Sequence, residues 1–150
     1  MTNILRTSSD NKNFQTLIVL LDNDLYLRDG EDHSFYSQFN KTVDIKNIVL
    51  CFENNEPIGC GAFKNFDLDK IEIKRMFVRP EFRGDGIGYA ILKELETWAL
   101  ELNYKSAVLE TGKKQPEAIR LYQKAGYNII PNFGQYENVE NSICMIKQIA

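Results

Sequence analysis

Apolar side chains recur every three or four residues near the start of the chain, at Phe14, Leu17, Ile18, Leu21 and Leu25. This spacing places them on one face of an α-helix, and Asp10-Asn11 offers a cap for its first turn. We therefore predict a helix that ends near Asp29-Gly30, preceded by a short strand over Ile4–Ser8. Residues 31–46 predict a second, shorter helix with loops, whose apolar and aromatic members are Phe35, Tyr36 and Phe39.

The middle of the chain contains apolar, β-branched runs that are broken by polar turns. Asn47–Phe52 and Pro57–Phe63 flank the turn Glu53-Asn54-Asn55-Glu56, a pattern typical of a β-hairpin. A second polar turn, Asp67-Leu68-Asp69, leads into the run Lys70–Val78, which stops at Arg79-Pro80. These three strands predict an antiparallel meander.

Helical spacing returns further along the chain, at Ile87, Ile91, Leu92, Leu95, Trp98, Ala99 and Leu102. We then predict a strand over Lys105–Glu110, a helix over Gln115–Ala125 that Gly126 ends, and a last strand over Ser142–Ile149. The order is roughly β, α, α, β, β, β, α, β, α, β, β, which predicts an α/β (α+β) fold around one mixed sheet. A chain of 150 residues, of which 43% are hydrophobic, fits a single domain over residues 1–150.

The net charge limits the kinds of molecule that the chain is expected to bind. Its formal net charge is −3 and no clustered basic stripe is present, which argues against nucleic-acid binding and leaves room for a cationic substrate. No stretch approaches the roughly 18 apolar residues that span a bilayer, and the first residues lack the apolar core of a secretion signal. We therefore expect a cytoplasmic protein that does not bind membranes.

The cysteines and the histidine of the chain offer few candidates for catalytic or metal-binding residues. Cys51, Cys60 and Cys144 form no Cys-x-x-Cys pair and lie among apolar neighbours, which predicts buried, reduced thiols. The single histidine, His33, follows two acidic residues and is expected at the surface. We therefore expect neither a metal site nor a Ser-His-Asp triad.

A glycine-rich turn lies where a predicted strand passes into a predicted helix, with the sequence Arg83-Gly84-Asp85-Gly86-Ile87-Gly88. Free backbone N–H groups and the helix dipole attract phosphate at such a place. Two common phosphate motifs do not fit, because Gly-x-Gly-x-x-Gly needs glycine where Tyr89 stands and a P-loop needs glycine where Ala107 stands.

Three ordered motifs resemble those of the general-control-related N-acetyltransferases, the GNAT superfamily. The first is the turn Arg-x-x-Gly-x-Gly, formed here by Arg83, Gly86 and Gly88, which grips the pyrophosphate of coenzyme A in that family. The others are the strand Met76-Phe-Val-Arg-Pro80 before it and the later run Ala118-x-x-Leu121-Tyr122-x-x-x-Gly126-Tyr127. The resemblance covers about residues 47–130 and implies a GNAT-like mixed, mostly antiparallel sheet flanked by helices, with a splayed cofactor-binding strand pair.

The resemblance also implies which residues hold acetyl-CoA. The backbone of Met76, Phe77 and Val78 would pair with the pantetheine as an added strand does. The pyrophosphate would meet the amides of the turn, with the side chain of Asp85 facing solvent; these residues are Arg83, Gly84, Asp85, Gly86, Ile87 and Gly88. Where many members carry asparagine this chain has Gln115, a longer amide that can still bond the pantetheine arm.

The implied reaction is acetylation of a primary amine by direct transfer in a ternary complex. An alkylamine with a pKa near ~10.4 is almost fully charged at pH 7, a penalty of roughly 4–5 kcal/mol unless a base removes the proton. The first choice for that base is Glu72, whose other interpretation is an ion pair with Lys70 or Lys74. Glu110 is a second base or an anchor for the cationic amine.

Tyr122 occupies the position of the family's tyrosine and is expected to protonate the leaving thiolate, unless it is simply an aromatic side chain packed on the sheet. Phe133 and Tyr136 follow the last motif and would wall the acceptor pocket, or belong to the core. Tyr26 and Arg28 could bound the same pocket, with Arg28 suited to a substrate carboxylate.

The preferred acceptor is a small molecule such as an amino acid, a polyamine or an amine-bearing antibiotic. Three alternatives stay open: an enzyme that acts on a protein lysine or N-terminus, a non-catalytic CoA-binding module, and a structural protein with an accidental Arg-Gly-Asp-Gly-Ile-Gly. Family likeness further implies a homodimer, in which C-terminal strands pair across a two-fold axis.

Overall fold

The computed structural model describes residues 2–30 and 45–150. The helix predicted over 31–46, with Phe35, Tyr36 and Phe39, falls almost entirely outside the described residues, as does His33. The elements of the described part are β1 (Thr2–Thr7), α1 (Lys12–Asp29), β2 (Asn47–Glu53), β3 (Glu56–Asp67), β4 (Lys70–Val78), the 3-10 turn η2 (Pro80–Phe82), α3 (Ile87–Glu101), β5 (Ser106–Gly112), α4 (Pro116–Lys124), β6 (Asn128–Ile130), the 3-10 turn η3 (Gly134–Tyr136) and β7 (Ser142–Gln148).

The strands form one seven-stranded sheet in the order β1-β2-β3-β4-β5-β7-β6. Every neighbouring pair is antiparallel except β4 and β5, which run parallel. The predicted meander is therefore confirmed as β2-β3-β4. Its first turn has positive φ at both Asn54 and Asn55, 49° and 70°, the backbone geometry that a tight hairpin requires.

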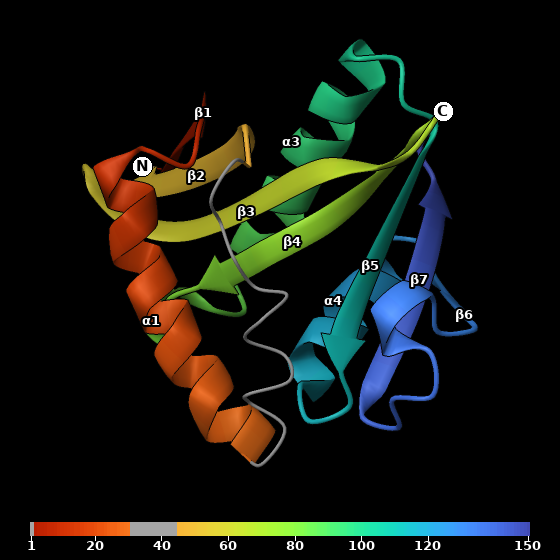
Figure 1. The fold of residues 1–150 in the computed structure, drawn as a ribbon. Coiled ribbons are helices and arrows are strands. Elements are labelled where there is room, and N and C mark those ends of the chain that lie inside the picture. The colour runs from red at the N-terminus through yellow and green to blue at the C-terminus, as the bar shows by residue number, and fades with distance from the viewer. Residues whose placement is uncertain (1, 31–44) are drawn as a thin grey trace.

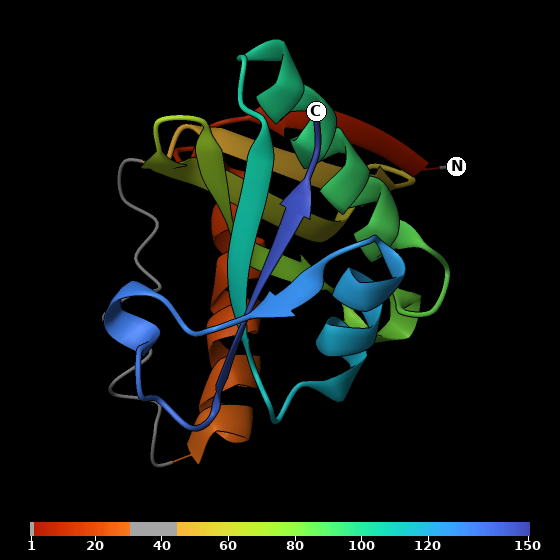
Figure 2. The same ribbon diagram turned by 90° about the vertical axis from the view of Figure 1, so that its right-hand side faces the viewer.

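Helices cover both faces of the sheet (Figure 1). On one face, Phe14, Leu17 and Leu21 of α1 pack against Leu50 and Phe77. On the other face lie α3 and α4, whose apolar side chains share a larger core with the strands. Figure 2 shows both of these helices on one side of β5 and β7, with η3 on the opposite side. The predicted mixed sheet between helices is confirmed.

A local signal in the sequence explains where the first helix begins. The side chain of Asn11 caps α1 by accepting hydrogen bonds from the backbone N–H groups of Asn13 and Phe14, at 2.8 and 3.2 Å.

The three cysteines are free and buried, as predicted. Burial raises the pKa of Cys60 to about 12, so this thiol stays protonated at neutral pH.

The strands β4 and β5 diverge shortly after they meet (Figure 1). Their pairing covers only Lys70↔Ser106, Ile71↔Ala107 and Glu72↔Val108. Beyond that point β4 continues beside β3, with a bulge near Arg75, while β5 continues beside β7. This confirms the splayed strand pair, and it leaves one edge of the second half of β4 without a neighbouring strand among the described elements.

Candidate active site

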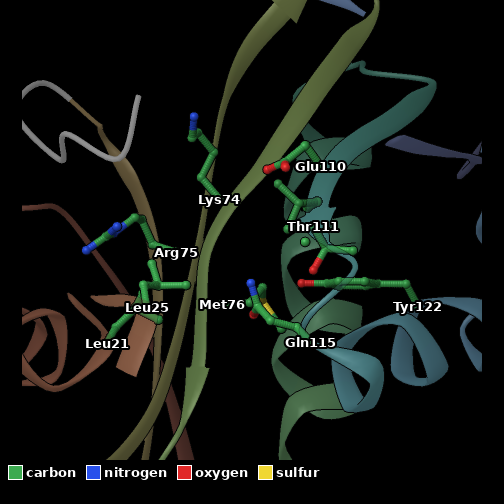
Figure 3. A pocket seen from close by; sticks show the side chains of 11 residues that line it. Leu21, Leu25, Lys74, Arg75, Met76, Glu110, Thr111, Gln115 and Tyr122 are labelled. Atoms are coloured by element: carbon green, nitrogen blue, oxygen red, sulfur yellow. The ribbon is translucent and has the colours of Figure 1, made fainter. Parts of the chain in front are cut away.

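A pocket lies where β4 and β5 separate (Figure 3). Four elements contribute to it: α1, β4, β5 with the turn that follows it, and α4. The lining residues are Leu21, Leu25, Ile73, Lys74, Arg75, Met76, Glu110, Thr111, Gly112, Gln115 and Tyr122. The pocket therefore brings together Met76, Glu110, Gln115 and Tyr122, four residues that the sequence predicted for the site.

Glu110 presents a carboxylate from β5 toward β4 (Figure 3). Its Oε2 accepts a hydrogen bond of 2.7 Å from the Oγ of Ser142, which lies on the neighbouring strand β7. Its negative charge acts on nearby groups, because it contributes to raising the pKa values of Tyr122 and Tyr136. Glu110 is thus an oriented carboxylate at the wall of the pocket.

Tyr122 projects from α4 with its hydroxyl directed into the pocket (Figure 3). The residue is 7% exposed, and its ring packs edge-on against Tyr127 at a centroid distance of 5.9 Å. Burial, and to a lesser extent the charge of Glu110, raise the pKa of its phenol above the ordinary value. The hydroxyl therefore keeps its proton throughout the neutral range and can act as a proton donor.

Glu72 lies deeper in the sheet and is not among the residues that line the pocket. It is 4% exposed, and its Oε2 lies 3.7 Å from the Nζ of Lys74. Burial lowers the pKa of Lys74, while the charges of Glu72 and Glu110 oppose that change. The ion pair that was the other interpretation of Glu72 is present, and Lys74 rather than Glu72 reaches the pocket.

The glycine turn joins η2 to α3. Gly84 and Gly86 have φ values of +90° and +82°, which other residues rarely adopt, and nothing lies within 4 Å of a Cβ built on either. The first intrahelical bond of α3 runs from Ala90 N to Gly86 O, so the preceding amides of the turn have no intrahelical acceptor. Open space beside free amides at a helix start fits a phosphate group.

The remaining residues of the turn fit the same use. Asp85 is exposed, as expected. A Cβ on Gly88 would lie 3.2 Å from Leu121 Cδ2, so glycine allows α3 and α4 to approach each other. Arg83 donates a 2.7 Å hydrogen bond from Nε to Val78 O, and its guanidinium lies 5.6 Å from the ring centroid of Phe77.

The end of β4 supplies the backbone edge that the sequence predicted for the pantetheine. Phe77 and Val78 pair with Cys60 and Gly59 of β3, so their other edge faces the side where β5 has diverged. The side chain of Phe77 is buried in the core under α1. Gln115 lies just before α4, where its backbone O accepts a hydrogen bond from Ala118 N at 3.1 Å.

The residues predicted to bound the acceptor do not line the pocket. Tyr26 is 62% exposed on α1. Phe133 packs edge-on against Phe66 at 4.9 Å and against Tyr136 at 6.1 Å, and Tyr136 is 2% exposed, which agrees with the alternative that they are core.

Arg28 is also absent from the pocket lining and is engaged within the chain. Its Nε lies 3.2 Å from Asp24 Oδ1, and its Nη1 pairs with Glu117 of α4. Arg28 thus links α1 to α4, and its contact with a substrate carboxylate stays a prediction.

The sequence did not predict the other lining residues, which are Leu21, Leu25, Ile73, Lys74, Arg75, Thr111 and Gly112. The two leucines were correctly predicted on the apolar face of α1, but nothing in the helical pattern indicates that part of this face borders a cavity. For the charged pair one signal was available: Lys70–Lys74 alternates between polar and apolar residues, and Arg75 interrupts that alternation where the structure has a bulge.

Residues 2–30 and 45–150 contain no group of three or more His, Cys, Asp or Glu side chains placed to hold a metal ion. None of the helices described is both long enough and apolar enough to cross a membrane.

Comparison with known proteins places these features in a family. The sequence model of the Acetyltransferase (GNAT) family matches residues 15–127. An IAA acetyltransferase of Azospirillum brasilense is 37% identical over 93 residues, which cover 61% of this chain and 61% of that protein. An uncharacterized N-acetyltransferase of Schizosaccharomyces pombe is 36% identical over 94 residues, 57% of this chain and 58% of that protein. The chain thus spans about three fifths of the length of these relatives.

Solved structures share the fold along the whole chain. A candidate acyl-CoA N-acyltransferase of Klebsiella pneumoniae has a TM-score of 0.83 and 25% identity, and covers 100% of this chain and 99% of that chain. A GNAT family acetyltransferase of Elizabethkingia anophelis with acetyl-CoA bound has a TM-score of 0.70 and 24% identity, covering 98% and 97%. The PaiA N-acetyltransferase of Thermoplasma acidophilum, in complex with coenzyme A, has a TM-score of 0.74 and 18% identity, covering 99% of each chain.

Proposed function

Because the chain belongs to the acetyltransferase (GNAT) family, we propose that it is an acetyl-CoA-dependent N-acetyltransferase that acts on a primary amine of a small molecule. The observation that carries this proposal is the geometry of one junction. The free edge of β4, which leads into the glycine turn, and the pocket with Glu110 and Tyr122 both lie where β4 leaves β5. Acyl transfer needs such positioning of cofactor, proton acceptor and proton donor.

The cofactor supplies the activated acetyl thioester when it is bound. The pyrophosphate is bound by the backbone amides of the turn after Arg83, which have no intrahelical acceptor and lie beside open space at Gly84 and Gly86; the amide of Arg83 itself already donates to Pro80 O at 3.2 Å. The free edge of Met76, Phe77 and Val78 holds the pantetheine by backbone hydrogen bonds, as an added strand would be held. Gln115, whose side chain lines the pocket, bonds the same arm.

Glu110 accepts the proton of the acceptor ammonium, directly or through a water molecule. It is the carboxylate that lines the pocket, and its hydrogen bond from Ser142 fixes the orientation of the group. Glu72, the first choice from the sequence, acts through Lys74 in this proposal, because Lys74 stands at the pocket wall and pairs with it at 3.7 Å. Tyr122 donates its proton to the leaving thiolate, a task suited to a phenol that stays protonated at neutral pH.

A small acceptor is favoured over a peptide by the position of α1. Leu21 and Leu25 of this helix line the pocket opposite Glu110 and Tyr122, so the acceptor meets walls on both sides. A peptide substrate instead requires an open groove that admits backbone on either side of the modified residue.

Calorimetric titration of the purified protein with acetyl-CoA tests the proposal first. We expect saturable binding with one cofactor per chain, followed by release of free thiol when primary amines are added. The same thiol assay with lysine-containing and free N-terminal peptides separates the two classes of acceptor. Absence of binding and of thermal stabilisation by acetyl-CoA would contradict the proposed function, and binding without turnover of any amine or peptide would indicate a CoA-binding module.

A further inference from the structure

Arg75 is a buried guanidinium at the pocket wall with donors that have no acceptor. Its side chain is 1% exposed, and its Nη2 donates a 2.6 Å hydrogen bond to Asp22 Oδ1. Its Nε and Nη1 are buried and have no hydrogen-bond partner among residues 2–30 and 45–150. Buried polar atoms of native proteins are nearly always paired, and an unpaired charged donor is among the costliest exceptions. A bound anion is one group that could supply the missing acceptors.

The backbone of β4 is unusual at Arg75, whose guanidinium points toward α1 and away from Glu110 and Tyr122 (Figure 3). Arg75 has a φ of +58°, unusual for a residue with a side chain, and lies at the point where the register between β3 and β4 shifts. Its carbonyl oxygen accepts a hydrogen bond of 3.3 Å from Cys60 Sγ, which ties the bulge to β3. In a regular strand neighbouring side chains point to opposite faces, but here every residue from Ile73 to Met76 lines the pocket. Strained backbone of this kind is characteristic of ligand sites.

The charges of the pocket are separated between its two walls. Figure 3 shows Arg75 extending from β4 on the side of α1, whereas Glu110 extends from β5 toward β4. Lys74 adds a second cationic side chain to the β4 wall. The pocket thus offers a carboxylate on one wall and cationic groups on the other, a layout that matches a molecule carrying both an amine and an acid.

We propose that Arg75, supported by Lys74, forms an anion subsite of the acceptor pocket and that the acceptor is an aminocarboxylate. This inference rests on the proposed function, and it names the substrate class for the same site. The amine of the acceptor lies toward Glu110, and its carboxylate accepts hydrogen bonds from the unpaired donors of Arg75. Both atoms are covered in this structure, so the proposal requires a side-chain movement that exposes them.

The same layout disfavours polyamines. A second ammonium group on the β4 wall would meet Lys74 and Arg75, whose charges are already balanced in part by Glu72 and Asp22, and would gain no carboxylate of its own. Arg75 differs from Arg28 in that its Nε and Nη1 have no partner among the described residues, whereas Arg28 has two carboxylate partners.

Matched pairs of acceptors test the subsite. Protein saturated with coenzyme A is titrated calorimetrically with alanine and ethylamine, leucine and isopentylamine, phenylalanine and phenethylamine, and lysine and cadaverine. Within each pair the two molecules differ only in the carboxylate. We expect at least one aminocarboxylate to bind about 10-fold to 100-fold more tightly than its amine, as a charge-assisted hydrogen bond to a buried guanidinium provides. Equal or weaker binding of the acid in every pair overturns the proposal.

Variants of the wall identify the group responsible. Arg75→Gln should remove the preference for the acid by weakening the binding of the acid, whereas Lys12→Gln, which removes one positive charge from an exposed site at the start of α1, should keep the preference. Arg75→Lys is the second variant if Arg75→Gln does not fold, and it should reduce the preference while retaining the charge. An equal loss for acid and amine in the Arg75 variants would indicate a structural role and would overturn the subsite.

Thiol release with acetyl-CoA, measured on the same pairs, separates this inference from the proposed function. Preferential binding of an acid without any acetylation contradicts the transferase and leaves the subsite intact. Equal turnover of acid and amine contradicts the subsite and leaves the transferase intact.

Discussion

The glycine turn and the acceptor pocket meet at the same junction but are built in different ways. The turn is a single run of six residues, Arg83 to Gly88, whose proposed contacts to a cofactor come from backbone amides and a helix start. The pocket takes side chains from α1, β4, β5 and α4, and one of its walls depends on a bulge. A common cofactor can be held by a conserved type of backbone geometry, whereas the acceptor is selected by side chains that the tertiary fold brings together.

The largest effect is expected at the turn, from Gly86→Glu. At a φ of +82° any side chain is strained, and a carboxylate there would lie beside the pyrophosphate. Like-charge contact costs several kcal/mol, so acetyl-CoA affinity should fall by about 10³-fold or more. Calorimetric titration with acetyl-CoA measures the change.

The matched control for this variant is Gly134→Glu. Gly134 also has a positive φ, +53°, with nothing within 4 Å of a built Cβ, but it lies in η3 and outside the pocket. It should lose similar stability, about 1 kcal/mol, and bind acetyl-CoA normally. Equal loss of affinity in both variants would show that strain, and not the proximity of Gly86 to a phosphate, caused it.

The second largest effect is expected from Tyr122→Phe, which should change kcat without changing the affinity for acetyl-CoA. Tyr122→Phe keeps the ring contact with Tyr127 and removes only the hydroxyl, so acetyl-CoA affinity should not change. Loss of a general acid should lower kcat by about 10²–10³-fold. Because the pKa of Tyr122 is raised, the wild-type rate should not decline from loss of this proton until well above pH 10. Tyr89→Phe, an exposed tyrosine on α3, is the control, and an unchanged rate in Tyr122→Phe would remove Tyr122 as the acid.

The third test compares the two carboxylates of the junction. Glu110→Gln should lower kcat/KM by about 10²-fold, because the base that lines the pocket is lost. Glu72→Gln should act mainly on folding: it leaves Lys74 buried without its 3.7 Å partner, at a cost of about 3 kcal/mol in the free energy of unfolding. Steady-state kinetics and urea unfolding of both variants separate the two effects. A larger kinetic loss in Glu72→Gln than in Glu110→Gln would restore Glu72 as the base.

The same contrast explains how much the sequence could predict. The sheet followed from local periodicity, while the family and the splayed strands followed from the resemblance carried by three ordered motifs, and the comparisons and the structure confirm them. The acceptor wall did not follow, because Arg75 acquires its position from a bulge and from its partners Asp22 and Cys60, which are 53 and 15 residues distant. The ion pair of Arg28 could not be predicted for the same reason, since its partner Glu117 lies on α4 and is brought to it only by folding.

The smallest effect is expected from Asp24→Asn, at the boundary between the two regions. Asp24 Oδ2 lies 3.8 Å from Arg83 Nη2, so α1, which lines the pocket, competes with the cofactor for a cation of the turn. The pair is about one-third exposed, and its loss should change stability by less than about 1 kcal/mol. Without this competitor acetyl-CoA should bind about 2-fold to 5-fold more tightly at low salt, and the gain should fade as salt screens the charges.

Asp69→Asn, which removes a carboxylate 3.7 Å from Lys70 outside the pocket, is the control for net charge. If both variants raise the affinity equally, the gain comes from the net charge of the protein, and α1 does not communicate with the turn through Arg83.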